Sequence, residues 1–276
     1  MIQELTKADL PNVLPLSSDV PHLCAVDAVI DGTSPGRIWA DDASSPKSAI
    51  ASTVEGEYVF GVSDDEGLNA SLRTLILETI LTAGRAAGWS SLNLRCSSPA
   101  WTATVEDMLA DIASVKEQRE FYSAEQCAVD WQAAIPRGFH MRRVDEELLG
   151  RTDLKNIKRV NGWARGNFGS IDAFLAHGFG FCLLHGGNIV SWCISDCVSG
   201  ERCEVGIHTD EEYRRRGFAT LAAAAAVDHC LLRGLKRIGW HCSAHNVASA
   251  ATARKVGFKK VLDYHAFKVD AREMRT

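Results

Sequence analysis

The sequence predicts an α/β (α+β) fold that contains two successive domains. Two observations lead to this prediction. The chain has 276 residues, more than a single hydrophobic core usually organises, and the same order of strands and helices occurs twice along it. A stretch around Pro136, Ala-Ile-Pro-Arg-Gly, separates the two passes and is typical of a linker. We therefore expect domains at residues 1–135 and 136–276.

The first pass begins with helical residues and continues in short β-rich runs. Asp19 is expected to cap a helix whose apolar side chains recur at helical spacing as far as Ile30. Turn residues separate the runs that follow. The predicted elements are, in order, strands at 37–41, 48–54 and 57–62, a helix at about 68–87 and a strand at 90–96.

The second pass follows the same order after the linker. Gly234 and Gly257 stand just past two predicted helices, where a left-handed backbone suits glycine. The predicted elements are strands at 179–185, 188–196 and 203–209, a loop at 211–218, a helix to Arg233, a strand at 237–243, a helix to Val256 and a strand at 261–269.

The two passes can be superimposed at a fixed offset. Gly88 and Cys96 lie 146 residues before Gly234 and Cys242, so that each pair marks a helix end followed by a strand. This correspondence indicates an internal duplication, although coincidence within an α/β chain is the alternative.

Composition excludes several classes of protein. The formal net charge of −5 and the pI near 6.0 give no reason to expect nucleic acid as a partner. The most apolar run, residues 222–227, is far shorter than the ~20 residues of a membrane span. The acidic, proline-containing start differs from an export signal, so we expect a cytoplasmic protein without membrane contact.

The nine cysteines show no framework for disulfides or metal. Their number is odd and no C-x-x-C pair occurs. Cys193, Cys197 and Cys203 form the only cluster, but two of them fall in a predicted strand and its turn. We interpret them as small buried apolar residues and expect no metal site.

The segment that carries chemistry runs from Cys203 to Cys230. A strand leads into a basic loop that contains Gly217 and opens directly into a helix. The unpaired amides and the dipole of a helix start favour an anion, and a glycine lets a phosphate approach the backbone. Three arginines at positions 214–216 add positive charge at the rim. The alternative interpretation is a solvated basic loop.

This segment resembles motif A of the GNAT acetyltransferase superfamily, whose pattern is matched by Arg214, Gly217 and Ala219. Downstream, HNVASAATARKVGF resembles motif B of the same superfamily, with matches at Asn246, Ser249, Gly257 and Phe258. Both motifs occur in the order of the family. This resemblance covers about 130 residues. Residues 35–62 also resemble a two-domain GNAT subfamily, which implies two tandem GNAT-like domains, each a mixed, mostly antiparallel sheet flanked by helices, the first of them degenerate.

The resemblance also implies a site and a co-substrate. Acetyl-CoA would lie between the strands that end near Thr209 and Cys242, with no metal involved. Its diphosphate would meet the amides after Tyr213, and its pantetheine arm would pair with the strand near Ile207. The residues expected to bind coenzyme are Ile207, His208, Thr209, Arg214, Arg215, Arg216, Gly217, Phe218, Ala219, Thr220, Asn246 and Ser249.

A protonated amine must lose a proton before it can attack a thioester, so we sought a base. Glu204 stands on the motif A strand where many family members place a catalytic glutamate, and His208 alternates onto the same face. A strand carboxylate in a salt bridge or facing solvent is the alternative interpretation of Glu204. The tyrosine acid of many relatives is replaced by Ala253, which leaves Ser249, Tyr264 or water as proton donors.

The first half lacks the features of a coenzyme site. At the same offset Arg214, Gly217 and Ala219 correspond to Leu68, Ser71 and Arg73, and the loop before the helix reads SDDEG. An acidic loop repels a diphosphate, so we expect coenzyme only in the second half.

Together these features predict an N-acetyltransferase, an acyltransferase that uses acetyl-CoA and a small-molecule amine acceptor. A non-catalytic sensor that binds acyl-CoA is the alternative, because the acid at position 253 is missing.

Overall fold

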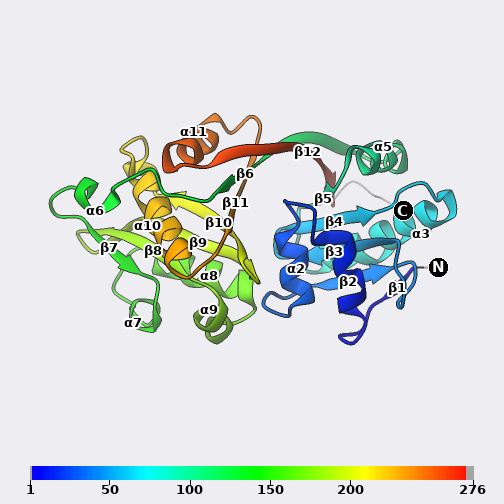
Figure 1. Ribbon diagram of the computed structural model, residues 1–276, viewed down its shortest axis with the longest axis horizontal. Helices are drawn as coiled ribbons and strands as arrows, with labels where there is room; N and C mark the ends of the chain where they lie inside the picture. Colours follow the sequence, from blue (N-terminus) through cyan, green and yellow to red (C-terminus); the bar gives the residue numbers. More distant parts are fainter. Residues whose placement is uncertain (1, 272–276) are drawn as a thin grey trace. The chain divides into compact units, whose positions relative to one another are not determined.

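The computed structural model describes residues 2–271, which form two compact units. The N-terminal unit comprises residues 2–32, 36–119 and 263–271, and the C-terminal unit comprises residues 33–35 and 120–262. Figure 1 labels the elements of both units. This division differs from the expected one, because residues 120–135 belong to the C-terminal unit and residues 263–271 to the N-terminal unit. Compactness does not define independently folding domains, so the domains 1–135 and 136–276 stay a prediction.

The N-terminal unit is built on a mixed sheet. Its strands pair antiparallel except for β4 and β5, which are parallel, and the end of the last strand of the chain pairs antiparallel with β5. The strand order is β1 (Gln3–Glu4), β2 (Arg37–Ala40), β3 (Ser48–Thr53), β4 (Gly56–Gly61), β5 (Ser91–Cys96), β12 (Lys259–Asp270) and the first half of β6 (Ser114–Ala124). The four strands predicted in the first pass are therefore confirmed, whereas β1 was not predicted.

One continuous helix covers a face of this sheet. It consists of α3 (Glu66–Thr74), a π-helical stretch η2 (Leu75–Ile80) and α4 (Leu81–Ala86), as predicted for residues 68–87. Its buried side chains Leu72, Ile76 and Leu81 pack with strand residues in one core. The helix α5 (Pro99–Met108), capped by the Ser98 hydroxyl, and the strand β6 (Ser114–Ala124) follow and were not predicted.

The prediction for the first helix was wrong at its start. The chain forms η1 (Leu10–Val13) and α1 (Leu14–Ser17) before α2 (Cys24–Ile30), and the N-cap of α2 is Leu23. Asp19 cannot cap α2 because the chain turns again at residues 21 and 22, which moves the helix start to Cys24.

The C-terminal unit contains a second mixed sheet with the same local order. The strands β10 and β11 are parallel, and β7 to β10 pair antiparallel in sequence. The order is the end of β6, β11 (Arg237–Ser243), β10 (Arg202–Thr209), β9 (Asn188–Ser199), β8 (Gly180–His185) and β7 (His140–Arg143). The predicted strands 179–185, 188–196, 203–209 and 237–243 are confirmed.

Helices cover both faces of this second sheet. On one face, α10 (Phe218–Leu232) and α11 (Val247–Val256) pack on alternate strand residues such as Cys193 and Val205. On the other face, α7 (Glu146–Leu149), α8 (Ile157–Phe168) and α9 (Ile171–His177) pack on Trp192 and Ile194. A sheet flanked by helices in each unit confirms the predicted fold class.

Small side chains explain the position of α10 in the C-terminal unit. All five alanines from Ala222 to Ala226 are buried, and α10 contacts α11 and α6 (Trp131–Ala134) as well as strands β8, β9 and β10. Alanine keeps helix propensity high while it lets the helix axis approach its neighbours. Burial on several sides fixes the start of α10, which is where the candidate site begins.

Candidate active site

The loop between β10 and α10 contains two residues with a left-handed backbone, one on each side of Arg216. Arg215 has φ 61° and Gly217 has φ 81°, both in the left-handed region, and Gly217 is the N-cap of α10. No side chain caps this helix. The first-turn amides of an α-helix have no partner within the helix, so the start of α10 offers N-H groups and a positive dipole end to an anion.

A cavity of about 730 Å³ lies at this helix start. It is bounded by the end of β10, the loop before α10, the first turn of α10 and one side of α11. The lining residues are Ile207, His208, Thr209, Tyr213, Arg214, Arg215, Gly217, Phe218, Ala219, Thr220, Asn246, Ala248, Ser249, Ala251, Thr252 and Lys255. A pocket of this size accommodates a cofactor-sized ligand.

The structure brings together nearly all the residues that the sequence associated with coenzyme. Every one of them lines the cavity except Arg216. The sequence reasoning missed the contribution of α11 beyond Asn246 and Ser249. The signal was present, since Ala248, Ala251, Thr252 and Lys255 are spaced so that they share one helical face.

Arg216 contacts aromatic rings instead of the cavity. The carbon Cζ of its guanidinium lies 4.9 Å from the ring centroid of Phe218, 5.6 Å from that of Tyr213 and 5.7 Å from that of Phe139. These distances are within the range of cation–π attraction. Of the three consecutive arginines, two therefore face the cavity and one faces an aromatic cluster.

His208 lies at the end of β10 and lines the cavity. Its ring stacks on Trp192, with 4.4 Å between the centroids. Partial burial lowers the pKa of His208, and the positive charges of Arg159 and Arg214 lower it further. The imidazole is therefore neutral at pH 7 and able to accept a proton.

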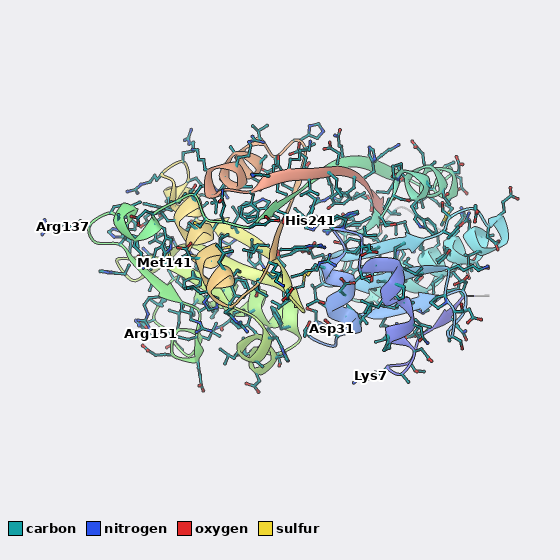
Figure 2. All side chains as sticks on the ribbon, in the orientation of Figure 1. Lys7, Asp31, Arg137, Met141, Arg151 and His241 are labelled. Atoms are coloured by element: carbon teal, nitrogen blue, oxygen red, sulfur yellow. The ribbon has the colours of Figure 1, made fainter. Side chains whose placement is uncertain are left out.

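Glu204 is buried in the sheet, with 1% of its surface exposed, and it is not among the residues that line the cavity. The Cys197 thiol donates to its Oε2 over 3.4 Å, and Nε2 of His241 lies 3.0 Å from its Oε1. Figure 2 labels His241, which extends from β11. Gly239 leaves room for this carboxylate, because a Cβ there would come within 2.8 Å of its Cγ. Glu204 is thus held by neighbours within the C-terminal unit.

The candidate proton donors Ser249 and Tyr264, and position 253 where the tyrosine is missing, lie in different surroundings. Ala253 is fully buried in the core beside α10. Ser249 lines the cavity, and its hydroxyl accepts a hydrogen bond from Nε1 of Trp240 over 3.0 Å. Tyr264 belongs to the N-terminal unit, where its hydroxyl accepts a hydrogen bond from Nε of Arg119 over 2.9 Å. Asn246 caps α11 by accepting from the amide of Ser249.

Tryptophans and cysteines serve mainly in packing. Trp192 and Trp240 are buried, and Trp163 donates from Nε1 to Asp196 over 2.7 Å. All nine cysteines are free thiols, and eight of them are buried. Burial raises the pKa of Cys96 to about 12 and also that of Cys193, so such thiols stay protonated at neutral pH.

Among residues 2–271, no helix has both the length and the apolar character required to cross a bilayer.

Comparisons with known proteins identify the family of the chain. The family model for GNAT acetyltransferases matches residues 16–267. The chain is 29% identical over 268 residues to the uncharacterized N-acetyltransferase YdfB of Bacillus subtilis (strain 168), covering 96% of this chain and 97% of that protein.

Solved structures share the fold over nearly the whole chain. A GCN5-related N-acetyltransferase-like protein from Streptococcus suis 89/1591 superposes with a TM-score of 0.67 at 24% identity, covering 95% of this chain and 98% of that one. A tandem GNAT protein from the clavulanic acid biosynthesis pathway superposes with a TM-score of 0.63 at 11% identity over the full length of both chains. The match of the family model over residues 16–267 places this chain in the GNAT acetyltransferase family.

Proposed function

We propose that this chain is an N-acetyltransferase that transfers the acetyl group of acetyl-CoA to an amine of a small-molecule acceptor. The observation that carries the proposal is the cavity at the start of α10, where a glycine N-cap, two arginines and a histidine converge. This combination suits a negatively charged carrier at one end and proton transfer at the other.

The carrier would bind through the helix start. Its diphosphate would accept hydrogen bonds from amides between Arg215 and Thr220, with Arg214 and Arg215 at the rim. Gly217 supports this arrangement, because the space where a side chain would begin is empty within 4 Å. The pantetheine arm would extend along the end of β10 near Ile207 and Thr209. Asn246 and Ser249 would line its other side from α11.

His208 is the base that the geometry supports best. It lines the cavity and is neutral at pH 7, whereas Glu204 is buried and held by Cys197 and His241. The amine nitrogen would form a bond to the thioester carbon as its proton moves to His208, and the bond from carbon to sulfur would then break. A backbone N-H of β10 would stabilise the oxyanion. The thiolate would take a proton from water or Ser249.

Turnover of acetyl-CoA tests this proposal. Purified protein would be titrated with coenzyme A by calorimetry, and thiol release from acetyl-CoA would be followed with a panel of primary amines. We expect binding and amine-dependent thiol release. Binding without release by any amine would favour a non-catalytic acyl-CoA sensor, and no binding would reject the assigned cavity.

A pair of variants assigns the base. His208→Gln should lower kcat about a hundredfold and remove the acid limb of the pH profile, since activity requires neutral His208 and falls as pH drops through its lowered pKa. The measurement is kcat at saturating acetyl-CoA and saturating amine from pH 5 to 9. Glu204→Gln is the matched control and should keep the acid limb. The opposite result, a limb lost only in Glu204→Gln, would assign the base to Glu204.

A further inference from the structure

The loop that leads into α10 is fixed where it begins. The amide of Asp210 donates to the carbonyl of Val190 over 2.9 Å. One oxygen of the Asp210 carboxylate accepts from Nδ2 of Asn156 over 2.8 Å, and Nζ of Lys155 lies 3.5 Å from that same oxygen. The first residue of the loop therefore has a single position relative to the sheet and to the start of α8.

Four aromatic side chains form a cluster beside the loop: Tyr213 from the loop, Phe218 from the start of α10, and Phe139 and His185 from elsewhere in the chain. Phe139 stacks on His185 with 4.2 Å between centroids and contacts Phe218 at 4.7 Å. Tyr213 meets Phe139 edge to face at 6.5 Å. Phe139 precedes β7, so the cluster ties the loop to a strand that is distant in sequence.

The three consecutive arginines divide between two environments. Arg214 and Arg215 line the cavity, and Nε of Arg214 donates to the carbonyl of Thr209 over 3.3 Å. Arg216 alone lies over the rings of the aromatic cluster, within 6 Å of three centroids. A planar guanidinium stacks on rings in a way that the ammonium of lysine does not reproduce.

The backbone on both sides of Arg216 is in a conformation that needs support. Arg215 has φ 61° and Gly217 has φ 81°. A left-handed backbone costs free energy for a residue with a side chain, so surrounding contacts must hold Arg215 in place. Both neighbouring side chains make contacts: Arg214 donates to the carbonyl of Thr209, and Arg216 lies over the aromatic rings.

We propose that Arg216 is a positioning residue, which anchors the loop on the aromatic cluster and so keeps the amides from Arg215 onward directed at the cavity. This inference rests on the proposed function for the identity of the ligand. It assigns to Arg216 a role different from that of Arg214 and Arg215, although all three carry the same charge. The planar shape of the side chain matters in this role, and the charge alone is insufficient.

Charge-conserving variants test the proposal. We expect Arg216→Lys to bind coenzyme A about three- to tenfold more weakly, with a salt dependence equal to that of the wild type, because no phosphate contact is lost. It should raise KM for acetyl-CoA and leave kcat unchanged. Arg215→Gln should weaken binding and also flatten the salt dependence. Arg237→Lys, at an exposed position on β11, is the matched control and should change nothing.

Two further measurements show whether Arg216 holds the loop in place. They distinguish this role from a loss of overall stability and from failure of the proposed function. Phe139→Leu combined with Arg216→Lys should cost less affinity than the sum of the two single changes, because the two side chains share a contact. Trypsin should cut unliganded Arg216→Lys after residues 214 or 215 three- to tenfold faster than wild type, while the melting temperature stays the same.

Wild-type affinity in Arg216→Lys, together with weaker binding and a flatter salt dependence in Arg216→Gln, would overturn the proposal and make Arg216 a phosphate ligand. If the wild type fails to bind coenzyme A, the proposed function fails, and the cleavage rates still decide whether Arg216 anchors the loop.

Discussion

The starts of α3 and α10 differ in what they offer a ligand, although each helix follows the first strand of a parallel pair. At α3 the carboxylate of Asp65 accepts from the amide of Leu68 over 2.9 Å, and acidic residues surround it. At α10 the N-cap is Gly217, which has no side chain to cap the helix. The amides at the start of α3 are therefore capped by a side chain of the chain itself, whereas no side chain caps those at the start of α10. Under the proposed function, the residue at the N-cap would decide which of the two helix starts binds the coenzyme.

The largest effect is expected when an aspartate, the N-cap residue of α3, replaces the glycine at the N-cap of α10. Gly217→Asp should lower the affinity for coenzyme A by about a thousandfold, since a carboxylate about 4 Å from a phosphate at the surface costs about 4 kcal/mol. Calorimetry measures the effect. Gly217→Asn is the matched control, because asparagine has the same shape and tolerates a left-handed backbone. Equal losses in both variants would show that shape matters and charge does not.

The strands that precede these two helices each carry a buried carboxylate. Glu57 on β4 and Glu204 on β10 are both 1% exposed. Burial raises the pKa of Glu57 to about 7, a shift that a hydrogen bond from Ser52 offsets only in part. A pKa raised in the folded state stabilises the protein at low pH, and this contribution is lost as pH rises toward 7. Glu57→Gln should therefore raise the free energy of unfolding at pH 8 by up to about 3 kcal/mol.

Urea denaturation at pH 5 and pH 8 measures the effect of Glu57→Gln. The control is Glu66→Gln, an exposed glutamate at the start of α3, which should not change the difference between the two pH values. An unchanged pH dependence in Glu57→Gln would mean that Glu57 is ionised in the folded protein.

The smallest expected effect concerns the cap of α3 itself. Asp65→Ala removes the side chain that satisfies the amide of Leu68 and should lower the free energy of unfolding by about 1 kcal/mol. Affinity for coenzyme A should stay at the wild-type value, because the proposed site lies at the start of α10 in the other unit. A second equivalent of coenzyme A bound to Asp65→Ala would contradict the assignment of binding to one unit alone.

Much of the fold could be predicted from the sequence, because its signals are local. The strands of both passes and the helices α10 and α11 follow from apolar spacing and from Gly234 and Gly257, which have φ 78° and φ 120°. The strand β6 escaped prediction because lysine, glutamate and arginine occupy much of its first half. Its pairing depends on segments far away in the chain, which no local pattern indicates.

The cavity could also be predicted in outline, since glycine, arginines and helix start are contiguous in the sequence. The contact between Arg216 and the aromatic rings could not be predicted. Phe139 lies 77 residues before Arg216 (216 − 139), and the two meet only in the folded chain. Likewise the carboxylate of Glu204 meets His241 across two parallel strands. Sequence spacing located these residues near the site but did not assign their partners.

The pairing of β12 with β5 has a consequence for the order of assembly. Phe267 and Val269 belong to the core of the N-terminal unit, and residues 266–270 lie between β5 and β6 in the strand order. Because residues 266–270 are synthesised long after β5, the sheet of this unit stays incomplete on the ribosome until they have emerged. Until then β5 has an unsatisfied edge, which is where a chaperone or an aggregating neighbour would attach.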